Sequence, residues 1–215
     1  MEREEAIVRL KELTDKDLHI VGAKHGIYAT VNGKQNKGWA GQVCERHLGL
    51  ALNSCRSPNF GSWELKVIPL KYLKSGMLAF KETMAICMID RVEVANKQFY
   101  ESHLLRKLAK MVVVARTVGS HYTEPSFVFK VSDFVLSEDL YEQIESDYDE
   151  IRNVIRDPKQ GFDCLTGRMG LLVQPRTKGP GHGSRSRAFY ARKKLLGHIF
   201  GDLNSSGNGQ DAGSQ

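Results

Sequence analysis

The sequence contains few features of secreted, membrane or zinc-binding proteins. Its four cysteines, Cys44, Cys55, Cys87 and Cys164, are widely separated and include no C-x-x-C pair. Neither a disulfide framework nor a zinc cluster is therefore expected. No apolar run approaches the roughly 18 residues that a membrane helix needs, and the charged start MEREEAIVRLKEL is unlike a signal peptide. We expect a cytoplasmic protein without membrane association.

What the chain does contain is an ordinary globular composition. Of its 215 residues, 41% are hydrophobic and 26% are charged, which excludes a collagen, a coiled coil and a wholly disordered chain. The length corresponds to roughly one and a half average domains. One sizeable core, with room for a second lobe, is expected.

The positive charge is concentrated near the carboxyl end. The net charge is +6, yet residues 1–164 hold 23 basic and 23 acidic residues, whereas residues 165–200 hold eight basic residues and no acidic one. This local excess favours a polyanionic partner, and nucleic acid before a membrane. A basic face that only increases solubility is the alternative.

Hydrophobic periodicity predicts both helices and strands along the chain. Helices are expected at 2–13, 38–50, 137–155 and 189–200, with Ser137 as a cap, and strands at 63–70, 84–89, 111–115, 127–131 and 170–173. The nearly all-apolar runs at 84–89 and 111–115 are typical of central strands that are covered on both faces. We therefore predict an α/β fold whose sheet lies between helices. Residues 14–37 look irregular or extended, with a tight turn at Asn32-Gly33.

The strongest chemical signal lies in residues 57–66, with the sequence SPNFGSWELK. On a strand, Glu64 and Lys66 share one face and lie about 6.5–7 Å apart. A carboxylate can bind a hard cation such as Mg²⁺, and a neighbouring lysine can orient or help to deprotonate the water that attacks a phosphodiester. A Glu-x-Lys pair alone is more often a solvated ion pair, so its meaning depends on the surrounding segments.

These segments resemble the PD-(D/E)xK nucleases, and within them the family of the MutH mismatch-repair endonuclease and the related GATC-cutting restriction endonucleases. The matches occur in the family's order over roughly residues 30–200: KGWAG at 37–41, Glu45, HLG at 47–49, ELKVIP at 64–69, ET at 82–83, SH at 102–103, RKL at 106–108, MVVV at 111–114 and FYARKK at 189–194. The resemblance implies a restriction-endonuclease-like mixed sheet flanked by helices, with a C-terminal DNA-binding arm that forms a cleft.

The resemblance also implies roles for individual residues. Glu64 would be a metal ligand, Glu45 would project toward the same Mg²⁺ ion, and Lys66 would position the water. Lys107 would lie near the scissile phosphate. Without the resemblance, Glu45 and Lys107 are explained as well by charges on a helix surface. We predict a nuclease core at 1–164, a basic DNA-gripping arm at 165–200 that packs against it, and a disordered tail at 201–215.

One position departs from the family pattern. The family has an aspartate where this chain has Asn59, which would be both a catalytic residue and a metal ligand. A neutral amide is a much poorer ligand for Mg²⁺ than a carboxylate, so a catalytically impaired protein is expected. Either the aspartate was replaced to trap an uncut DNA complex, or the chain is a naturally impaired relative. Retention of the other active-site positions favours the replacement.

The basic residues that we expect to bind DNA lie mainly in the arm. The predicted set is Lys37, Arg106, Arg176, Lys178, Arg185, Arg187, Tyr190, Arg192, Lys193 and Lys194. Most of these are suited to phosphates, which give affinity with little sequence information. Arg185, Arg187 and His182 belong to a glycine-rich stretch that could enter a groove and contact bases. Packing against Phe189 is an equally good role for Tyr190.

The leading hypothesis is a sequence-specific, Mg²⁺-dependent double-stranded DNA endonuclease of restriction type. The short turn before Trp63 and the glycine-rich basic loop favour that type, and a homodimer on DNA is one way for it to cut both strands. The alternatives are a strand-nicking mismatch-repair endonuclease and a non-catalytic DNA-binding relative. RNA binding has little support, because no paired aromatic signature of an RNA-recognition sheet is present.

Overall fold

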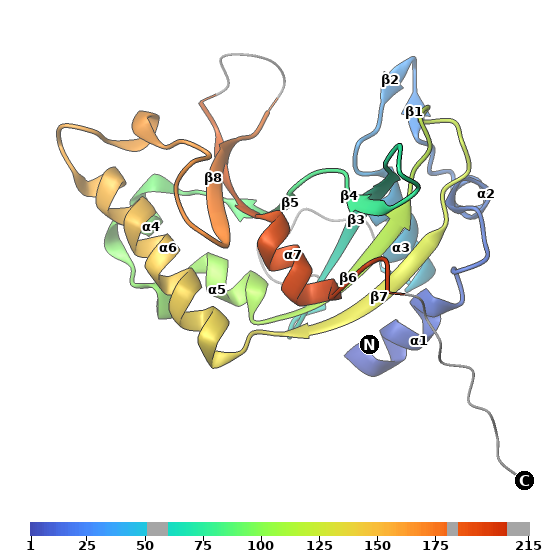
Figure 1. Ribbon diagram of the computed structural model, residues 1–215, viewed down its shortest axis with the longest axis horizontal. Helices are drawn as coiled ribbons and strands as arrows, with labels where there is room; N and C mark the ends of the chain where they lie inside the picture. The colour runs from blue at the N-terminus through green and yellow to red at the C-terminus, as the bar shows by residue number, and fades with distance from the viewer. Residues whose placement is uncertain (51–59, 180–184, 206–215) are drawn as a thin grey trace, which may run out of the picture.

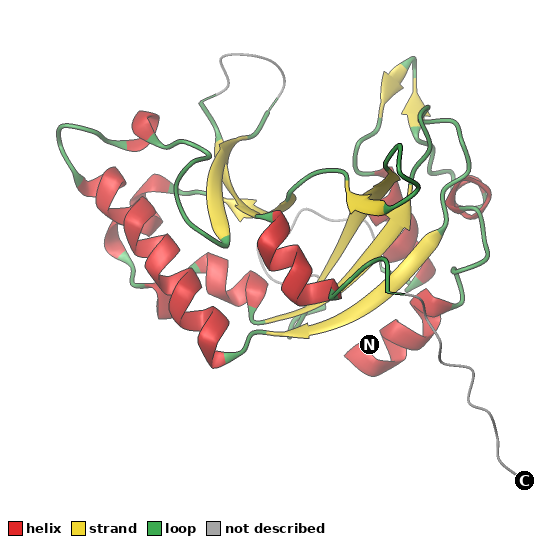
Figure 2. Cartoon of the chain, viewed as in Figure 1, coloured by secondary structure: helices red, strands yellow, loops and turns green. Residues whose placement is uncertain are grey.

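The protein is built around a curved four-stranded sheet that has helices on both faces (Figures 1 and 2). The computed structural model describes residues 1–50, 60–179 and 185–205. The strands of this sheet, in spatial order, are β4 (Leu78–Phe80), β3 (Glu64–Tyr72), β6 (Lys110–Thr117) and β7 (Val128–Val135). The central pair, β3 and β6, is parallel and the outer strands are antiparallel to their neighbours. The predicted mixed sheet flanked by helices is thus confirmed.

Strand β6 divides the interior into two cores. Met111, Val113 and Ala115 contribute to one hydrophobic cluster, whereas Val112 and Val114 contribute to the other. All five side chains are fully buried, which is what an uninterrupted apolar strand requires. The prediction that residues 111–115 form a strand covered on both faces is therefore confirmed.

The N-terminal helices cover one face of the sheet. They are α1 (Arg3–Lys11), α2 (Leu18–Ala23) and α3 (Trp39–His47). The short helix α2 was not predicted, because six residues are too few to show a helical period; Asp17 caps it by accepting a hydrogen bond from the N–H of His19 (3.0 Å). Between α2 and α3, β1 (Thr30–Val31) and β2 (Lys34–Gln35) form a hairpin. Its turn is the predicted Asn32-Gly33 pair, and both residues have positive φ.

The other face is covered by helices that come later in the chain, from residue 91 onward. The helices there are α4 (Arg91–Asn96), α5 (His103–Leu108), α6 (Glu138–Arg156) and α7 (Lys193–Phe200), with short 3₁₀ turns at η1 (Phe99–Glu101) and η2 (Phe162–Cys164). Helix α6, predicted at 137–155, buries Ile144, Tyr148 and Ile151 on its apolar face. Ser137 occupies the N-cap position as expected, but its side chain makes no capping hydrogen bond.

A second, three-stranded sheet corrects two predictions. It consists of β5 (Met84–Met88), β9 (Arg187–Ala191) and β8 (Val173–Thr177), in that order. The segment predicted as a central strand at 84–89 is thus an edge strand of this smaller sheet. The helix predicted at 189–200 begins only at Lys193, because Phe189 pairs with both Cys87 and Pro175. Such pairing depends on distant segments and leaves no local signal.

The predicted strand at 170–173 is also displaced, since β8 begins at Val173. The preceding residues instead bind a buried carboxylate on α6. Asp147 is 2% exposed and accepts hydrogen bonds from the N–H groups of Leu171, Leu172 and Val173 at 2.8, 2.7 and 2.7 Å. Gly170 has φ +69°, and a Cβ there would lie 1.9 Å from the carbonyl oxygen of Val173. The base of the β8–β9 hairpin is therefore fixed to α6.

The arrangement separates two projecting hairpins. Figure 1 shows β8 and its neighbours on one side of the molecule and the β1–β2 hairpin on the other, with α7 crossing in front between them. Helix α7 contacts both β7 and β9. Among the helices that the structure describes, none is long and apolar enough to cross a membrane.

Candidate active site

The candidate site is centred on a buried carboxylate at the start of β3. The strand places Glu64 and Lys66 on one face, as its period of two requires. Glu64 is 2% exposed, and the Nζ of Lys66 donates to its Oε1 at 2.7 Å. Glu64 is thus buried and Lys66 is half-buried, so the pair is not a solvated pair on an exposed strand.

A second lysine reaches the same carboxylate from helix α5. The Nζ of Lys107 donates to Oε2 of Glu64 at 2.8 Å, and Lys107 is 6% exposed. Its helix is anchored by Ser102, whose Oγ accepts from the N–H of Leu105 at 3.0 Å. This burial excludes the interpretation of Lys107 as part of a solvated basic face.

The cluster places two ammonium groups on one carboxylate and therefore carries a net positive charge. Burying such charges is costly unless each is paired and hydrogen-bonded, and both oxygens of Glu64 are used in this way. Nearby, burial raises the pKa of the Cys87 thiol to about 12, although Lys66 and Lys107 oppose that shift. The thiol stays protonated at neutral pH, so Cys87 does not act as a nucleophile here.

Lys178 of the arm interacts electrostatically with Lys66 of this cluster. Burial lowers the pKa of Lys178, and the positive charge of Lys66 lowers it further. Lys178 follows directly after β8, and its backbone N–H donates to the carbonyl of Ser186 at 2.9 Å. A basic residue of the predicted DNA-binding arm thus contributes to the same positive region as Lys66.

Glu45 lies in a pocket beside the cluster, which we call the β3-edge pocket. Its volume is about 200 Å³, and its charged lining residues are Lys37, Glu45, Lys66, Glu82 and Arg116. The β3 residues that line the pocket, from Leu65 to Pro69, precede the part of β3 that pairs with β4, which runs from Leu70 to Tyr72. Glu45 extends from α3 and is half-buried. Lys66 connects the two groups, because it lines the pocket and also binds Glu64.

Arg116 in this pocket was missed by sequence reasoning, and Glu82 was noted only as part of a matching segment. Arg116 follows the apolar run of β6 and resembles an ordinary polar strand end. Only the register of β6 against β3, which places Arg116 opposite Pro69, brings it to the active-site edge.

The chemistry of the donors, but not their number, fits a magnesium ion. The carboxylate oxygens of Glu64 and Glu45 are hard ligands of the kind that Mg²⁺ prefers. Among the described residues, no group of three or more histidine, cysteine, aspartate or glutamate side chains is placed to hold a metal ion. Asn59, where the resembling family has its aspartate, lies outside the described residues.

The predicted DNA-binding residues of the arm have different surroundings. Arg176 donates to Oγ1 of Thr83 at 2.9 Å and lies 5.6 Å from the ring centre of Tyr190. The guanidinium of Arg187 lies 6.0 Å from the ring centre of Phe162. Arg185 is exposed, whereas His182 lies outside the described residues. The half-buried Tyr190 is thus held by an arginine on the neighbouring strand.

The remaining predicted contacts are spread over α7, α5 and the β3-edge pocket. Arg192 occupies the N-cap position of α7 without a capping hydrogen bond, and its Nη2 donates to the carbonyls of Gly167 and Met169 at 2.8 and 2.9 Å. This guanidinium fixes the loop before β8. Lys193 and Lys194 are exposed in the first turn of α7, and Arg106 forms an exposed ion pair with Glu93 at 3.5 Å. Lys37 is exposed and lines the β3-edge pocket.

Residues 48–146 match the family model described as the DNA mismatch repair enzyme MutH. The chain is MutH-like. The matched region of this MutH-like chain contains Glu64, Lys66 and Lys107, and it ends within α6. Glu45 and the arm lie outside it.

Several curated proteins extend the likeness over most of the MutH-like chain. It is 27% identical over 176 residues to the DNA mismatch repair protein MutH of Vibrio parahaemolyticus, a match that covers 80% of this chain and 74% of the relative. The corresponding protein of Escherichia coli O6:K15:H31 is 25% identical over 198 residues, covering 90% and 83%. That of Shewanella sp. strain ANA-3 is 28% identical over 179 residues, covering 81% and 77%. The likeness predicted from the motifs is confirmed.

Proposed function

We propose that the chain is a sequence-specific, Mg²⁺-dependent endonuclease that nicks one strand of double-stranded DNA. The observation that carries this proposal is the buried Lys66–Glu64–Lys107 cluster, which lies within the region that matches MutH. The relatives are named as mismatch repair proteins. Their names favour the nicking alternative over the restriction type that the sequence features favoured.

Each member of the cluster has a chemical task in this proposal. Glu64 holds both ammonium groups in fixed positions, so little reorganisation is needed when a phosphate enters. Lys66, on the side of the β3-edge pocket, orients the attacking water, and its positive charge favours loss of that water's proton to solvent. Lys107 stabilises the negative charge that develops on the phosphate oxygens.

A magnesium ion would be held by Glu64 and Glu45, with position 59 as a further ligand in the family pattern. It would supply positive charge against the phosphate oxygens. With an amide at Asn59, the site holds one negative charge fewer, which weakens metal binding and slows cleavage. A second candidate function follows from this residue, namely a relative that binds DNA without cutting it.

Plasmid cleavage by the Asn59→Asp variant tests the proposal. With Mg²⁺ present, we expect supercoiled plasmid to accumulate as open circles before any linear form appears, because one strand is cut at each site. The matched control, Asn59→Asp combined with Glu64→Gln, removes the carboxylate charge and is expected to leave the plasmid intact.

Other outcomes would contradict parts of the proposal. Linear product formed without an open-circle intermediate would indicate an enzyme of restriction type. If the Asn59→Asp variant leaves plasmids of many sequences intact, and the unmodified chain binds them equally with and without Mg²⁺, the nuclease proposal is wrong and the binding function replaces it.

A further inference from the structure

A polar cavity lies at the β1–β2 side of the molecule, and its lining includes none of Glu64, Lys66 and Lys107. Its volume is about 160 Å³. Its lining comes from α2, β2, the start of α3, the residue after β4, and the end of β6 with its following loop. The main side chains are His19, Gln35, Trp39, Lys81, Arg116 and Glu124. We call it the Arg116 cavity.

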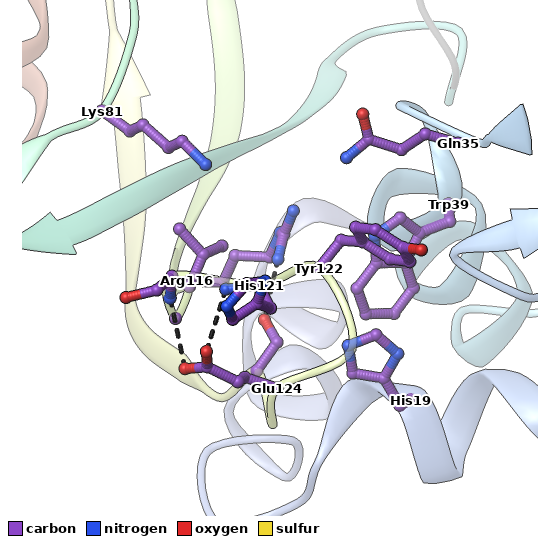
Figure 3. A pocket seen from close by; sticks show the side chains of 12 residues that line it. His19, Gln35, Trp39, Lys81, Arg116, His121, Tyr122 and Glu124 are labelled. Atoms are coloured by element: carbon purple, nitrogen blue, oxygen red, sulfur yellow. Dashed lines mark hydrogen bonds between the residues drawn. The ribbon is translucent and has the colours of Figure 1, made fainter.

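Positive and donor groups converge in this cavity. Figure 3 shows the polar ends of Lys81, Gln35 and Arg116 directed toward the same space. The carboxylate of Glu124 is used by its own loop, where it accepts hydrogen bonds from the N–H groups of Ser120 (3.2 Å) and His121 (2.9 Å). The open part of the cavity therefore presents donors, and an anion is the ligand that suits it.

Arg116 is held in place before any ligand arrives. Its Nη1 donates to Oγ of Ser126 at 2.8 Å, and its guanidinium lies 5.0 Å from the ring centre of Trp39. Trp39 is itself stacked on His19, with ring centres 4.3 Å apart. A planar guanidinium fixed by stacking and one hydrogen bond loses little entropy when it binds a phosphate through its remaining N–H groups.

The partial burial of Arg116 strengthens the argument. Burial lowers the pKa of its guanidinium below the usual value, although an arginine still stays protonated at neutral pH. A cation that has lost part of its hydration lies in a region of low effective dielectric, where an anion attracts it more strongly than in water. Lys81, by contrast, is exposed and can adjust its position to the ligand.

Arg116 also connects this cavity to the candidate active site, because it lines the β3-edge pocket together with Glu45 and Lys66. Arg116 lies opposite Pro69 in the sheet, and Pro69 is three residues beyond Lys66. That separation is about 10 Å along the strand. Since one DNA strand carries a charge about every 3.4 Å of helix axis, both sites can contact the same short stretch of DNA.

We propose that Arg116, Lys81 and Gln35 form a second phosphate-binding site, which holds an uncleaved phosphate of the DNA strand bound in the active site. This inference rests on the proposed function, because it takes DNA as the ligand. The site would fix the position of the strand a few nucleotides from the cut. It has no part in the chemical step.

Binding of a fluorescent DNA duplex over a range of salt concentrations tests this site on the chain as it stands, without cleavage. We expect Lys81→Gln and Arg116→Gln each to raise Kd roughly tenfold and to reduce the salt slope by about 0.9. The matched control is Lys159→Gln, which removes an exposed lysine just beyond the C-terminal end of α6, and it should change neither quantity. Lys81 is at the surface, so its variant tests the site even if Arg116→Gln fails to fold.

Duplexes with one neutral methylphosphonate locate the contacted phosphate. At one position near the cut, neutralisation should weaken binding of the unmodified chain but have no further effect on the Lys81→Gln variant. The second site is overturned if both variants bind DNA as tightly as Lys159→Gln does. It is also overturned if each methylphosphonate weakens binding by the variants as much as it weakens binding by the unmodified chain. If the unmodified chain binds no DNA, the proposed function fails as well, and that result is distinct from either of these.

Discussion

At the scale of single residues, the active site depends on an unusual ratio of charges. One buried carboxylate, Glu64, binds two ammonium groups, so removal of either lysine still leaves the carboxylate paired. The cost to stability is therefore smaller than for a lone buried ion pair, whose disruption typically costs about 3–5 kcal/mol. In the proposed mechanism the cost to catalysis is not shared in this way, because each lysine has its own task there.

Lys107→Met should accordingly separate catalysis from folding. In the Asn59→Asp background we expect the nicking rate to fall by roughly 10²–10³-fold, which is typical for loss of one group that stabilises transition-state charge. Thermal unfolding and DNA affinity should change little. Lys110→Met is the control, since Lys110 is an exposed lysine three residues away. An unchanged rate for Lys107→Met would remove Lys107 from the chemical step.

At the scale of secondary-structure elements, the part of the site that could be predicted is the part carried by one strand. The period of β3 correctly predicts that Glu64 and Lys66 share a face, and the burial of 111–115 is equally local. Lys107 and Glu45 were assigned from the resemblance, because their places depend on how α5 and α3 pack. Arg116 had no local signal, since its position depends on the register of β6 against β3, which is distant in the sequence.

At the same scale, Asp147 attaches the β8–β9 hairpin of the arm to α6. A substitution of Asp147 tests this attachment. An amide in place of its carboxylate would direct N–H donors at a group of backbone N–H donors. We expect Asp147→Asn to lower the free energy of unfolding by roughly 2–3 kcal/mol, measured by urea denaturation, and to weaken DNA binding. Glu142→Gln changes an exposed charge on the same helix and serves as control. Equal stability of both variants would show that the hairpin is held by other contacts.

At the scale of the whole molecule, charge is divided between a neutral body and a basic arm. Residues 1–164 are balanced, and residues 165–200 hold eight basic residues without an acidic one. Phosphate contacts give affinity that falls with salt, whereas base contacts give discrimination between sequences. The arm contains candidates for both, with Lys193 on α7 and Arg185 near the end of the hairpin.

Two substitutions in the arm should therefore have different effects. Lys193→Ala is expected to weaken binding to all duplexes and reduce the salt slope by about 0.9. Arg185→Ala should instead reduce the preference for the best sequence over random DNA, by about 1–3 kcal/mol if Arg185 contacts a guanine. Competition binding with cognate and random duplexes measures both. Equal losses on both kinds of DNA for the two variants would contradict this division.

The three-stranded sheet of β5, β9 and β8 has a consequence for how the preference for a DNA sequence can change among related proteins. Strand β5 comes from the predicted core segment, yet among the strands that the structure describes it pairs only with β9 of the arm. The hairpin is therefore not a detachable module: its β9 edge is completed by a strand about 100 residues earlier. An arm transplanted from a relative would meet a mismatched β5 unless both segments were exchanged together. If the arm selects the DNA sequence as proposed, substitutions in Met84–Met88 are expected to alter that selection through the position of β9.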